Sequence, residues 1–220
     1  MTRLLFLEVV NEMIYLDYAA TTPMSEEALA VYVESARTYF GNASSLHDVG
    51  TAANELLTIC RKQLAQLIRG EEKGIYFTSG GTEANVLAIR SLAYAHRHKG
   101  KHIITSSVEH ASVHAVCAQL EQEGFTVTYV PVDRFGQVDI EALEQALTDE
   151  TILVSVQHAN SEIGTIQPLQ QIGELLKEKQ IVFHSDCVQT FGKIPIDVKQ
   201  LHLDSISIAS HKIYGPKGVG

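Results

Sequence analysis

Short β-prone runs alternate with helical stretches along most of this chain, and this alternation is the feature that most limits its fold. The runs are rich in Val, Ile, Thr and Phe, residue types that favour strands. They span residues 75–77, 102–105, 126–130, 152–156, 181–184 and 205–209. The helical stretches span residues 83–97, 112–123, 140–147 and 169–179. Since parallel strands are joined by crossover helices, the alternation predicts an α/β fold of three layers with a mainly parallel sheet.

Two helices are predicted ahead of this region. Ser25 has the residue type of a helix N-cap and is followed by two glutamates, which suit the positive end of a helix dipole. This first helix is expected to run to about Tyr39. A polar loop over residues 41–47 separates it from a second helix over residues 49–68, which contains little Gly or Pro.

The size and the charge of the chain limit how many domains it can form and which partners it can bind. A chain of 220 residues can bury one sizeable core, so we expect one domain over residues 13–220, with residues 1–12 as an N-terminal extension ahead of it. The net charge of -9 disfavours nucleic acid or an anionic membrane as the main partner. No apolar stretch reaches a membrane-spanning length.

The cysteines and the N-terminus indicate the compartment. The three cysteines are odd in number and far apart, so they form neither a disulfide framework nor a zinc ribbon. The apolar residues 4–7 are interrupted by Glu8, and no signal-peptidase site follows them. We therefore expect a cytoplasmic protein.

Polar residues follow the β-prone runs at the points where the runs end. In open α/β sheets, ligands bind beyond the carboxyl ends of the strands, so these positions are candidates for chemistry. They are residues 78–83, Glu109 with His110, His158 with Asn160, Asp186 with Gln189, and Lys212.

Lys212 follows the last β-prone run and precedes a Gly-Pro turn. A lysine held against apolar surroundings loses proton affinity, because burial disfavours its charged form. Its neutral amine can form an imine with an aldehyde, which is the chemistry that pyridoxal 5'-phosphate (PLP) requires. An ordinary surface lysine gives the same local pattern, so the assignment of Lys212 depends on the other residues at this edge.

Residues 79–82, Ser-Gly-Gly-Thr, open a predicted helix. Their glycines allow close approach of the backbone to a ligand, and the free N–H groups of a first helical turn favour an anion such as phosphate. The sequence matches neither a Walker A loop nor a dinucleotide-binding fingerprint. A capped turn that binds nothing is the alternative.

Asp186 follows an apolar run, so its carboxylate is expected to be partly buried and to need a cationic partner. A protonated pyridine nitrogen is such a partner, and a helix cap or a buried hydrogen-bonded aspartate is the alternative. Gln189, one helical turn further on, could reach a ring oxygen or act as a cap. Cys187 has no neighbouring activating motif and is interpreted as a small buried filler.

His110 could stack on a cofactor ring from the end of its strand. With His114 it also has the spacing of a helical metal site, but no glutamate lies between them and no third ligand is evident. We therefore expect no metal and interpret His114 as an ordinary helix residue. Asn160 could donate to a substrate carboxylate or a cofactor oxygen, or it could be a turn residue.

Together these segments resemble the NifS-type cysteine desulfurases, which are PLP enzymes of the fold-type I, class V aminotransferase superfamily. The matching segments occur in the family's order across essentially the whole chain after Met13. They are YLDYAATTP (15–23), GNASSLH (41–47), FTSGGTEAN (77–85), EH (109–110), NSEIGTIQP (160–168), HSDCVQTFGK (184–193) and SHKIYGPKG (210–218).

The resemblance implies a PLP-binding large domain and a role for each candidate residue. Lys212 would form the imine with the cofactor and shuttle the α-proton, and His110 would stack on the ring. The other implied contacts are Asp186 with the pyridine nitrogen, Gln189 with the ring hydroxyl, Gly81, Thr82 and His211 with the phosphate, and Asn160 near the substrate carboxylate. The implied reaction converts L-cysteine to L-alanine and leaves a persulfide for a sulfur-acceptor protein, as in iron–sulfur cluster assembly. A homodimer is also implied.

Some positions differ from the family pattern. Ala43 replaces a usual proline and Gly81 a common alanine. Ala209 stands where the family usually has a serine that bonds the phosphate, so that contact is expected to be lost or moved to Ser210. The family continues past the position of Gly220 with a small C-terminal domain and a loop carrying the nucleophilic cysteine, so we expect the large domain to be incomplete and this chain alone to be inactive.

Two other functions stay open at this point. A related PLP enzyme, such as a selenocysteine lyase or a class V aminotransferase, would share the cofactor residues. A non-catalytic binding or scaffold module would keep the fold without the reaction.

Overall fold

The computed structural model describes residues 14–220. Its centre is a sheet of five parallel strands in the order β2-β1-β3-β4-β5. The strands are β1 (His102–Ser106), β2 (Thr126–Val130), β3 (Thr151–Ser155), β4 (Val182–Asp186) and β5 (Ser205–Ser207). The predicted extension, residues 1–12, lies outside the described residues.

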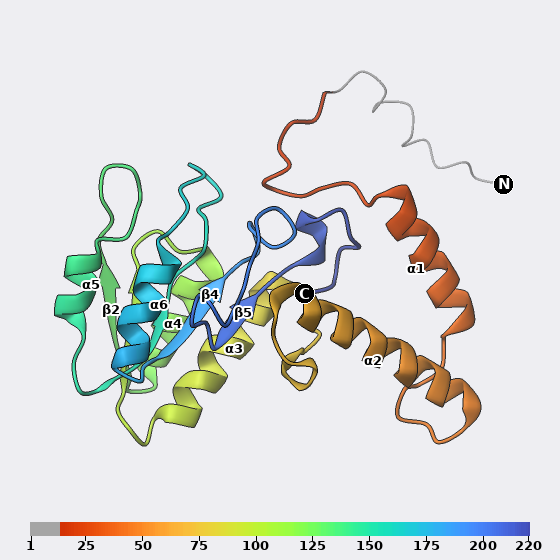
Figure 1. Cartoon of the computed structure of the whole chain (residues 1–220), viewed down its shortest axis with the longest axis horizontal. Coiled ribbons are helices and arrows are strands. Elements are labelled where there is room, and N and C mark those ends of the chain that lie inside the picture. Colours follow the sequence, from red (N-terminus) through yellow and green to blue (C-terminus); the bar gives the residue numbers. More distant parts are fainter. Residues whose placement is uncertain (1–13) are drawn as a thin grey trace.

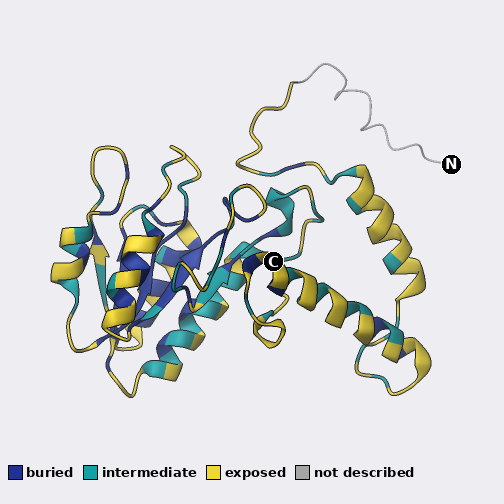
Figure 2. Ribbon diagram, viewed as in Figure 1, coloured by how far each residue is buried: buried dark blue, intermediate teal, exposed yellow. Residues whose placement is uncertain are grey.

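Helices cover both faces of this sheet, as Figure 1 shows. One face carries α3 (Gly81–His96) and α4 (Ala111–Gln122), and the other carries α5 (Ile140–Ala146) and α6 (Leu169–Glu178). Neighbouring strand residues point to opposite faces: Ile103 of β1 packs in the cluster of α3 and α4, and Ile104 packs in the cluster of α5 and α6. The buried residues concentrate in these layers (Figure 2). The predicted three-layer α/β fold is confirmed.

Most predicted elements are present to within one or two residues, but the run at residues 75–77 is not a strand. Tyr76 is 73% exposed, and none of the five strands pairs with this segment; the adjacent Thr78 exchanges two backbone hydrogen bonds with Gly220 (2.8 and 2.9 Å), which lies outside the sheet. The predicted strand at residues 205–209 ends early at Ser207, because its neighbour β4 ends opposite it at Asp186. A strand extends only as far as it has a partner for its backbone groups.

The helices α1 (Glu26–Thr38) and α2 (Asp48–Ile68) form an arm that extends away from the sheet (Figure 1). Ser25 caps α1 as predicted, accepting a hydrogen bond from the Ala28 N–H (3.1 Å). No residue of α1 is buried. The end of α2 joins the body through Ile68, which packs in the cluster around Phe191.

The segment ahead of α1 runs back along the body and attaches to the residues after β5. Thr22 donates from its backbone N–H to the His211 carbonyl (2.8 Å), and Ser25 donates to the Tyr214 carbonyl (3.0 Å). Thr22 is 4% exposed. The stretch that precedes the first helix is therefore part of the same edge of the fold as Lys212. Within residues 14–220, no helix is long and apolar enough to cross a bilayer.

Candidate active site

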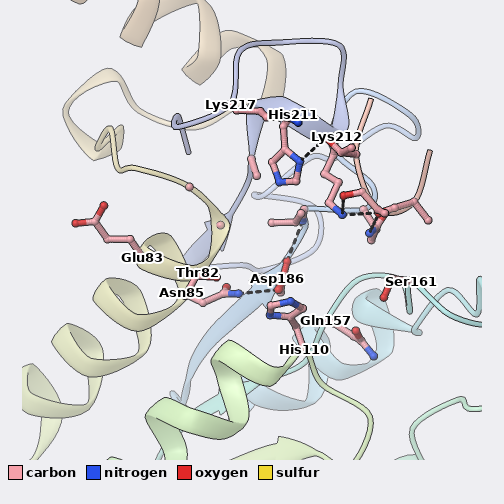
Figure 3. A pocket seen from close by; sticks show the side chains of 18 of the residues that line it. Thr82, Glu83, Asn85, His110, Gln157, Ser161, Asp186, His211, Lys212 and Lys217 are labelled. Carbon is pink, nitrogen blue, oxygen red and sulfur yellow. Dashed lines mark hydrogen bonds between the residues drawn. The ribbon is translucent and has the colours of Figure 1, made fainter. Parts of the chain in front are cut away.

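A cavity of about 810 Å³ lies at the carboxyl edge of the sheet, where the N-terminus of α3 meets the ends of the strands. Of the residues singled out in the sequence, it is lined by Gly81, Thr82, His110, Asp186, Gln189, His211 and Lys212. Figure 3 shows several of these side chains pointing toward one another across it. Because the strands are parallel, segments far apart in the chain end at this one edge.

Lys212 ends a short 3-10 turn (Ser210–Lys212) just past β5. Its Nζ donates to the backbone carbonyls of Ala19 and Ala20, the latter at 2.8 Å. Burial lowers the pKa of this ammonium, and the nearby positive charge of Lys193 lowers it further. Burial thus shifts the pKa of Lys212 in the direction that an imine-forming amine needs, and the negative charges of Asp17 and Asp186 oppose this shift.

Asp186 is the last residue of β4 and is 7% exposed. Its Oδ1 accepts from the Val188 N–H (2.9 Å) and its Oδ2 from Asn85 Nδ2 (2.7 Å). Burial raises the pKa of this carboxyl, and the two hydrogen bonds and the charges of His110 and Lys212 oppose that increase. A carboxylate so placed, without an ion-pair partner within residues 14–220, would be stabilised by a cationic ligand in the cavity.

His110 is the N-cap of α4, and its ring lines the cavity. Its Nδ1 accepts from the Ser112 N–H (3.1 Å) and contacts Ser112 Oγ at 2.7 Å. His114 lies elsewhere on α4 and stacks on Tyr129 (ring centroids 5.7 Å apart). In the described part of the chain, no three His, Cys, Asp or Glu side chains gather in an arrangement that could hold a metal ion.

The N-terminus of α3 faces the cavity with its backbone exposed. Gly80 is the N-cap with φ +155°, a backbone conformation that favours glycine, and no side chain caps the helix. The N–H groups of a first helical turn have no intrahelical acceptor. A Cβ on Gly81 would lie 2.9 Å from Val188 Cγ2, so Val188 occupies the space that an alanine methyl would need.

Gln189 and His211 hold the segment that precedes α1 against the cavity. Gln189 Nε2 donates to the Ala19 carbonyl (3.0 Å), and His211 Nδ1 lies 3.2 Å from Thr21 Oγ1. Burial lowers the pKa of His211, as do the nearby charges of Lys212 and Lys217.

Two predicted residues do not line the cavity. Asn160 Oδ1 accepts from the N–H groups of Glu162 and Ile163, and its Nδ2 donates to the Val108 carbonyl (3.2 Å), so its side chain stabilises a turn. Ser210 Oγ donates to the carbonyls of Pro216 and Val219. The hydroxyl lost at Ala209 is therefore not replaced by Ser210, because the turn after Lys212 uses it.

Sequence reasoning assigned no role to several residues that the structure brings to the site. Asn85 is 1% exposed and bonds Asp186, and Gln157 lines the cavity wall. Glu109 is 7% exposed and accepts from Ser106 Oγ (2.5 Å) and from the Gln157 N–H (2.9 and 3.0 Å). In the sequence, these residues stand out only as polar residues on the inward side of a helix or shortly after a strand. A helix cap gives the same local pattern, so the sequence alone does not identify them as site residues.

Comparison with known proteins agrees with this arrangement. The chain is 53% identical over 208 residues to a putative cysteine desulfurase NifS of Bacillus subtilis (strain 168), covering 94% of this chain and 53% of that relative. It is 49% identical over 210 residues to the cysteine desulfurase IscS of Methanosarcina thermophila, covering 96% of this chain and 52% of that relative. The chain thus spans about half the length of the curated relatives it matches.

Solved structures give the same result. A structure described as SspA in complex with cysteine superposes with a TM-score of 0.90 at 37% identity, covering 94% of this chain and 60% of that chain. A NifS-like protein also superposes with a TM-score of 0.90 at 37% identity, covering 94% and 57%. The resemblance seen in the sequence motifs is confirmed. The aminotransferase class-V family matches residues 14–220, and the chain belongs to that family.

Proposed function

We propose that residues 13–220 are the PLP-binding large domain of a cysteine desulfurase. The observation that carries this proposal is that Lys212, Asp186 and the uncapped N-terminus of α3 share one cavity. An amine of lowered proton affinity, a buried carboxylate and an anion-binding helix end are three groups that a pyridoxal phosphate needs at once. The similarity to named cysteine desulfurases supports the reaction.

The residues present fit the cofactor on their own chemistry. Lys212 is bonded only to backbone carbonyls, so releasing its amine breaks no ion pair with a carboxylate in the described part of the chain. Asp186 needs a cationic hydrogen-bond donor to stabilise its charge. The glycines at the start of α3 leave its N–H groups open to a phosphate.

When bound, PLP supplies an aldehyde carbon that captures an amino acid and a protonated ring that withdraws electrons from it. Lys212 would hold the cofactor and carry a proton on Nζ, and Asp186 would retain the proton on the ring nitrogen. His110 would cover one face of the ring, and Gln189 would bond its hydroxyl. Gly81, Thr82 and His211 would bind the phosphate, and Asn160 would have to leave its turn to contact a substrate carboxylate.

The reaction we propose converts L-cysteine to L-alanine and passes the sulfur as a persulfide to an acceptor protein. Burial raises the pKa of both Cys117 and Cys187 to about 12, and neither they nor Cys60 line the cavity. A thiolate is the nucleophile in such a transfer, so in this proposal the persulfide cysteine is none of these three. We further propose that the protein is a homodimer and acts in the cytoplasm; the free cysteines are compatible with that reducing compartment.

A selenocysteine lyase or another class V aminotransferase would use the same cofactor residues and differ in substrate. A scaffold module would keep the fold and bind no cofactor. Borohydride reduction separates the scaffold from the enzymes, and product analysis separates the enzymes from one another.

Borohydride reduction of the protein incubated with PLP tests the cofactor assignment. We expect a pyridoxyl adduct on the peptide that contains Lys212, mapped by mass spectrometry, and no adduct there in the Lys212→Ala variant. Lys193 and Lys217 lie close to the same site and serve as internal controls. An adduct on either of them in place of Lys212 would overturn the assignment.

A further inference from the structure

Asn85 joins two parts of the cavity that are separate in the sequence. It lies in the first turns of α3, is 1% exposed, and its side chain amide faces the ends of β4 and α4. Its neighbours are Asp186 Oδ2 at 2.7 Å, Ser112 Oγ at 3.0 Å and His184 Nε2 at 3.4 Å. Figure 3 shows Asn85 and Asp186 joined by a hydrogen bond beside His110.

The carboxylate of Asp186 fixes the orientation of the amide. An ionised carboxylate only accepts hydrogen bonds, so the NH₂ group of Asn85 must face it. The second hydrogen of that group then points to Ser112 Oγ, and Oδ1 faces the ring of His184. Burial lowers the pKa of His184 to about 4, so this ring is neutral. Both donors of the Asn85 amide are therefore used.

The same bonds determine where His110 carries its proton. Ser112 Oγ accepts from Asn85, so its own hydrogen is available for His110 Nδ1, which is 2.7 Å away. Nδ1 also accepts from the backbone N–H of Ser112 (3.1 Å). A nitrogen that accepts two hydrogen bonds carries no proton, so the neutral ring holds its proton on Nε2.

We infer that Asn85 is a positioning residue that orients the Asp186 carboxylate and keeps the Ser112 hydroxyl directed at His110 Nδ1, where it adds to the Ser112 backbone N–H in holding the Nε2–H tautomer. This inference rests on the proposed function for its consequence. With PLP bound, Asp186 would face a protonated ring nitrogen, and His110 would lie near that ring with Nδ1 occupied as an acceptor. A donor to a charged group contributes about two to three times as much as a donor to a neutral group, so Asn85 acts mainly on the ionised form of Asp186.

The tautomer is tested first on the cofactor-free protein, by ¹⁵N NMR of the histidine rings, with the His110 signals assigned by their loss in His110→Gln. We expect an unprotonated Nδ1 and a protonated Nε2 in the wild type. Asn85→Asp keeps the shape of the side chain but cannot donate, so the Ser112 hydroxyl turns toward it, His110 Nδ1 keeps only the bond from the Ser112 backbone N–H, and its ¹⁵N signal shifts. Ser112→Ala removes the bond from Oγ and should shift it as well.

Binding of PLP then tests the effect on Asp186, followed by absorbance. We expect Asn85→Asp to weaken binding by at least about tenfold, because it replaces a donor to Asp186 with a second carboxylate. Ser112→Ala leaves the bond from Asn85 to Asp186 intact and should weaken binding less than Asn85→Asp.

Gln167→Leu is the matched control. Gln167 is also a buried amide (3% exposed), but it bonds Gly136 and Val138 away from the cavity, so its loss should leave both the His110 signals and PLP affinity unchanged.

The outcomes are distinguishable from those of the proposed function. A wild type with its proton on Nδ1, or a folded Asn85→Asp variant with unchanged His110 signals, overturns the inference whether or not PLP binds. Failure of the wild type to take up PLP overturns the proposed function. The NMR result then still tests whether Asn85 acts on His110. Equal PLP affinity of the wild type and Asn85→Asp would show that Asn85 does not position Asp186.

Discussion

Glu109 should make the stability of this protein fall as the pH rises from about 4.5 to 8. Burial raises the pKa of this carboxyl from 4.5 to about 8, and the negative charge of Asp186 adds to the increase. In this window the folded protein keeps a proton on Glu109 that the unfolded chain has released. Because the folded state binds more protons, the stabilisation from Glu109 is complete below the pKa that this carboxyl has in the unfolded chain. It is lost as the pH rises through the higher pKa that the carboxyl has in the folded protein.

The size of the effect follows from the shift. Each pKa unit is worth about 1.4 kcal/mol, so the rise from 4.5 to about 8 corresponds to roughly 5 kcal/mol lost as the pH rises through both values. The hydrogen bonds from Ser106 and the Gln157 N–H already oppose the rise. They therefore do not add to this figure.

Glu109→Gln removes the titration. At pH 5.5 the variant should be less stable than the wild type, because its NH₂ group would face the Gln157 N–H, which approaches both carboxyl oxygens (2.9 and 3.0 Å). Two donors facing each other cost about 1–3 kcal/mol. At pH 8.5 the wild type carries a buried charge and the variant does not, so the variant should be at least as stable.

Urea unfolding at a series of pH values, followed by far-UV circular dichroism, measures both curves. The difference in the free energy of unfolding between wild type and variant reports on Glu109 alone, since the buried histidines titrate in both proteins. The exposed Glu55→Gln variant has the same chemical change and should alter the free energy of unfolding by less than about 0.5 kcal/mol at any pH. Parallel curves for the wild type and Glu109→Gln between pH 5 and 8 would refute the reasoning.

Three further predictions concern the cavity. Asp186→Ala, assayed in a chain long enough to complete the site, should lose on the order of two to three decades of PLP-dependent desulfuration, because breaking one side of a buried charged pair costs about 3–5 kcal/mol; a loss below about tenfold would mean that another group holds the ring proton. Gly81→Ala should lower Tm, since its Cβ would lie 2.9 Å from Val188 Cγ2, and Val188→Ala should restore part of the loss; strictly additive effects in the double variant would contradict this contact. Ala209→Ser should tighten the binding of PLP by a few-fold in calorimetry, because the Ala209 Cβ lies 3.5 Å from where a Gly81 Cβ would be, beside the first turn of α3; unchanged affinity would show that the new hydroxyl does not reach the phosphate.

Most strands and helices, and the edge of the sheet at which the candidate residues lie, could be predicted from the sequence. Short runs such as residues 126–130 identify strands because Val, Thr and Tyr favour the strand backbone. In a parallel sheet every strand ends at the same edge, so Lys212 and Asp186 could be assigned to one site from their positions after two strands. These inferences depend only on local pattern and on a general property of the fold.

Local pattern failed where a residue's partner is distant in the chain. Residues 75–77 have strand composition, but within residues 14–220 no strand pairs with them, and the adjacent Thr78 pairs with Gly220 outside the sheet. Ser210 has a suitable hydroxyl, but the turn that follows it uses that hydroxyl. A strand or a ligand contact forms only if the rest of the fold leaves a partner free, and short-range sequence does not record which partners are taken.

The polar network beneath the cavity could not be predicted from the sequence, because it joins residues that are distant in the chain. Asn85 and Asp186 are 101 positions apart, and Glu109 and the Gln157 N–H are 48 apart. These pairs meet because the strand order places β1, β3 and β4 side by side and packs α3 across them. Burial then makes each of these groups depend on its hydrogen-bond partners. The sequence thus supplied the groups that face the ligand, and the packing of the layers supplied the groups that hold them.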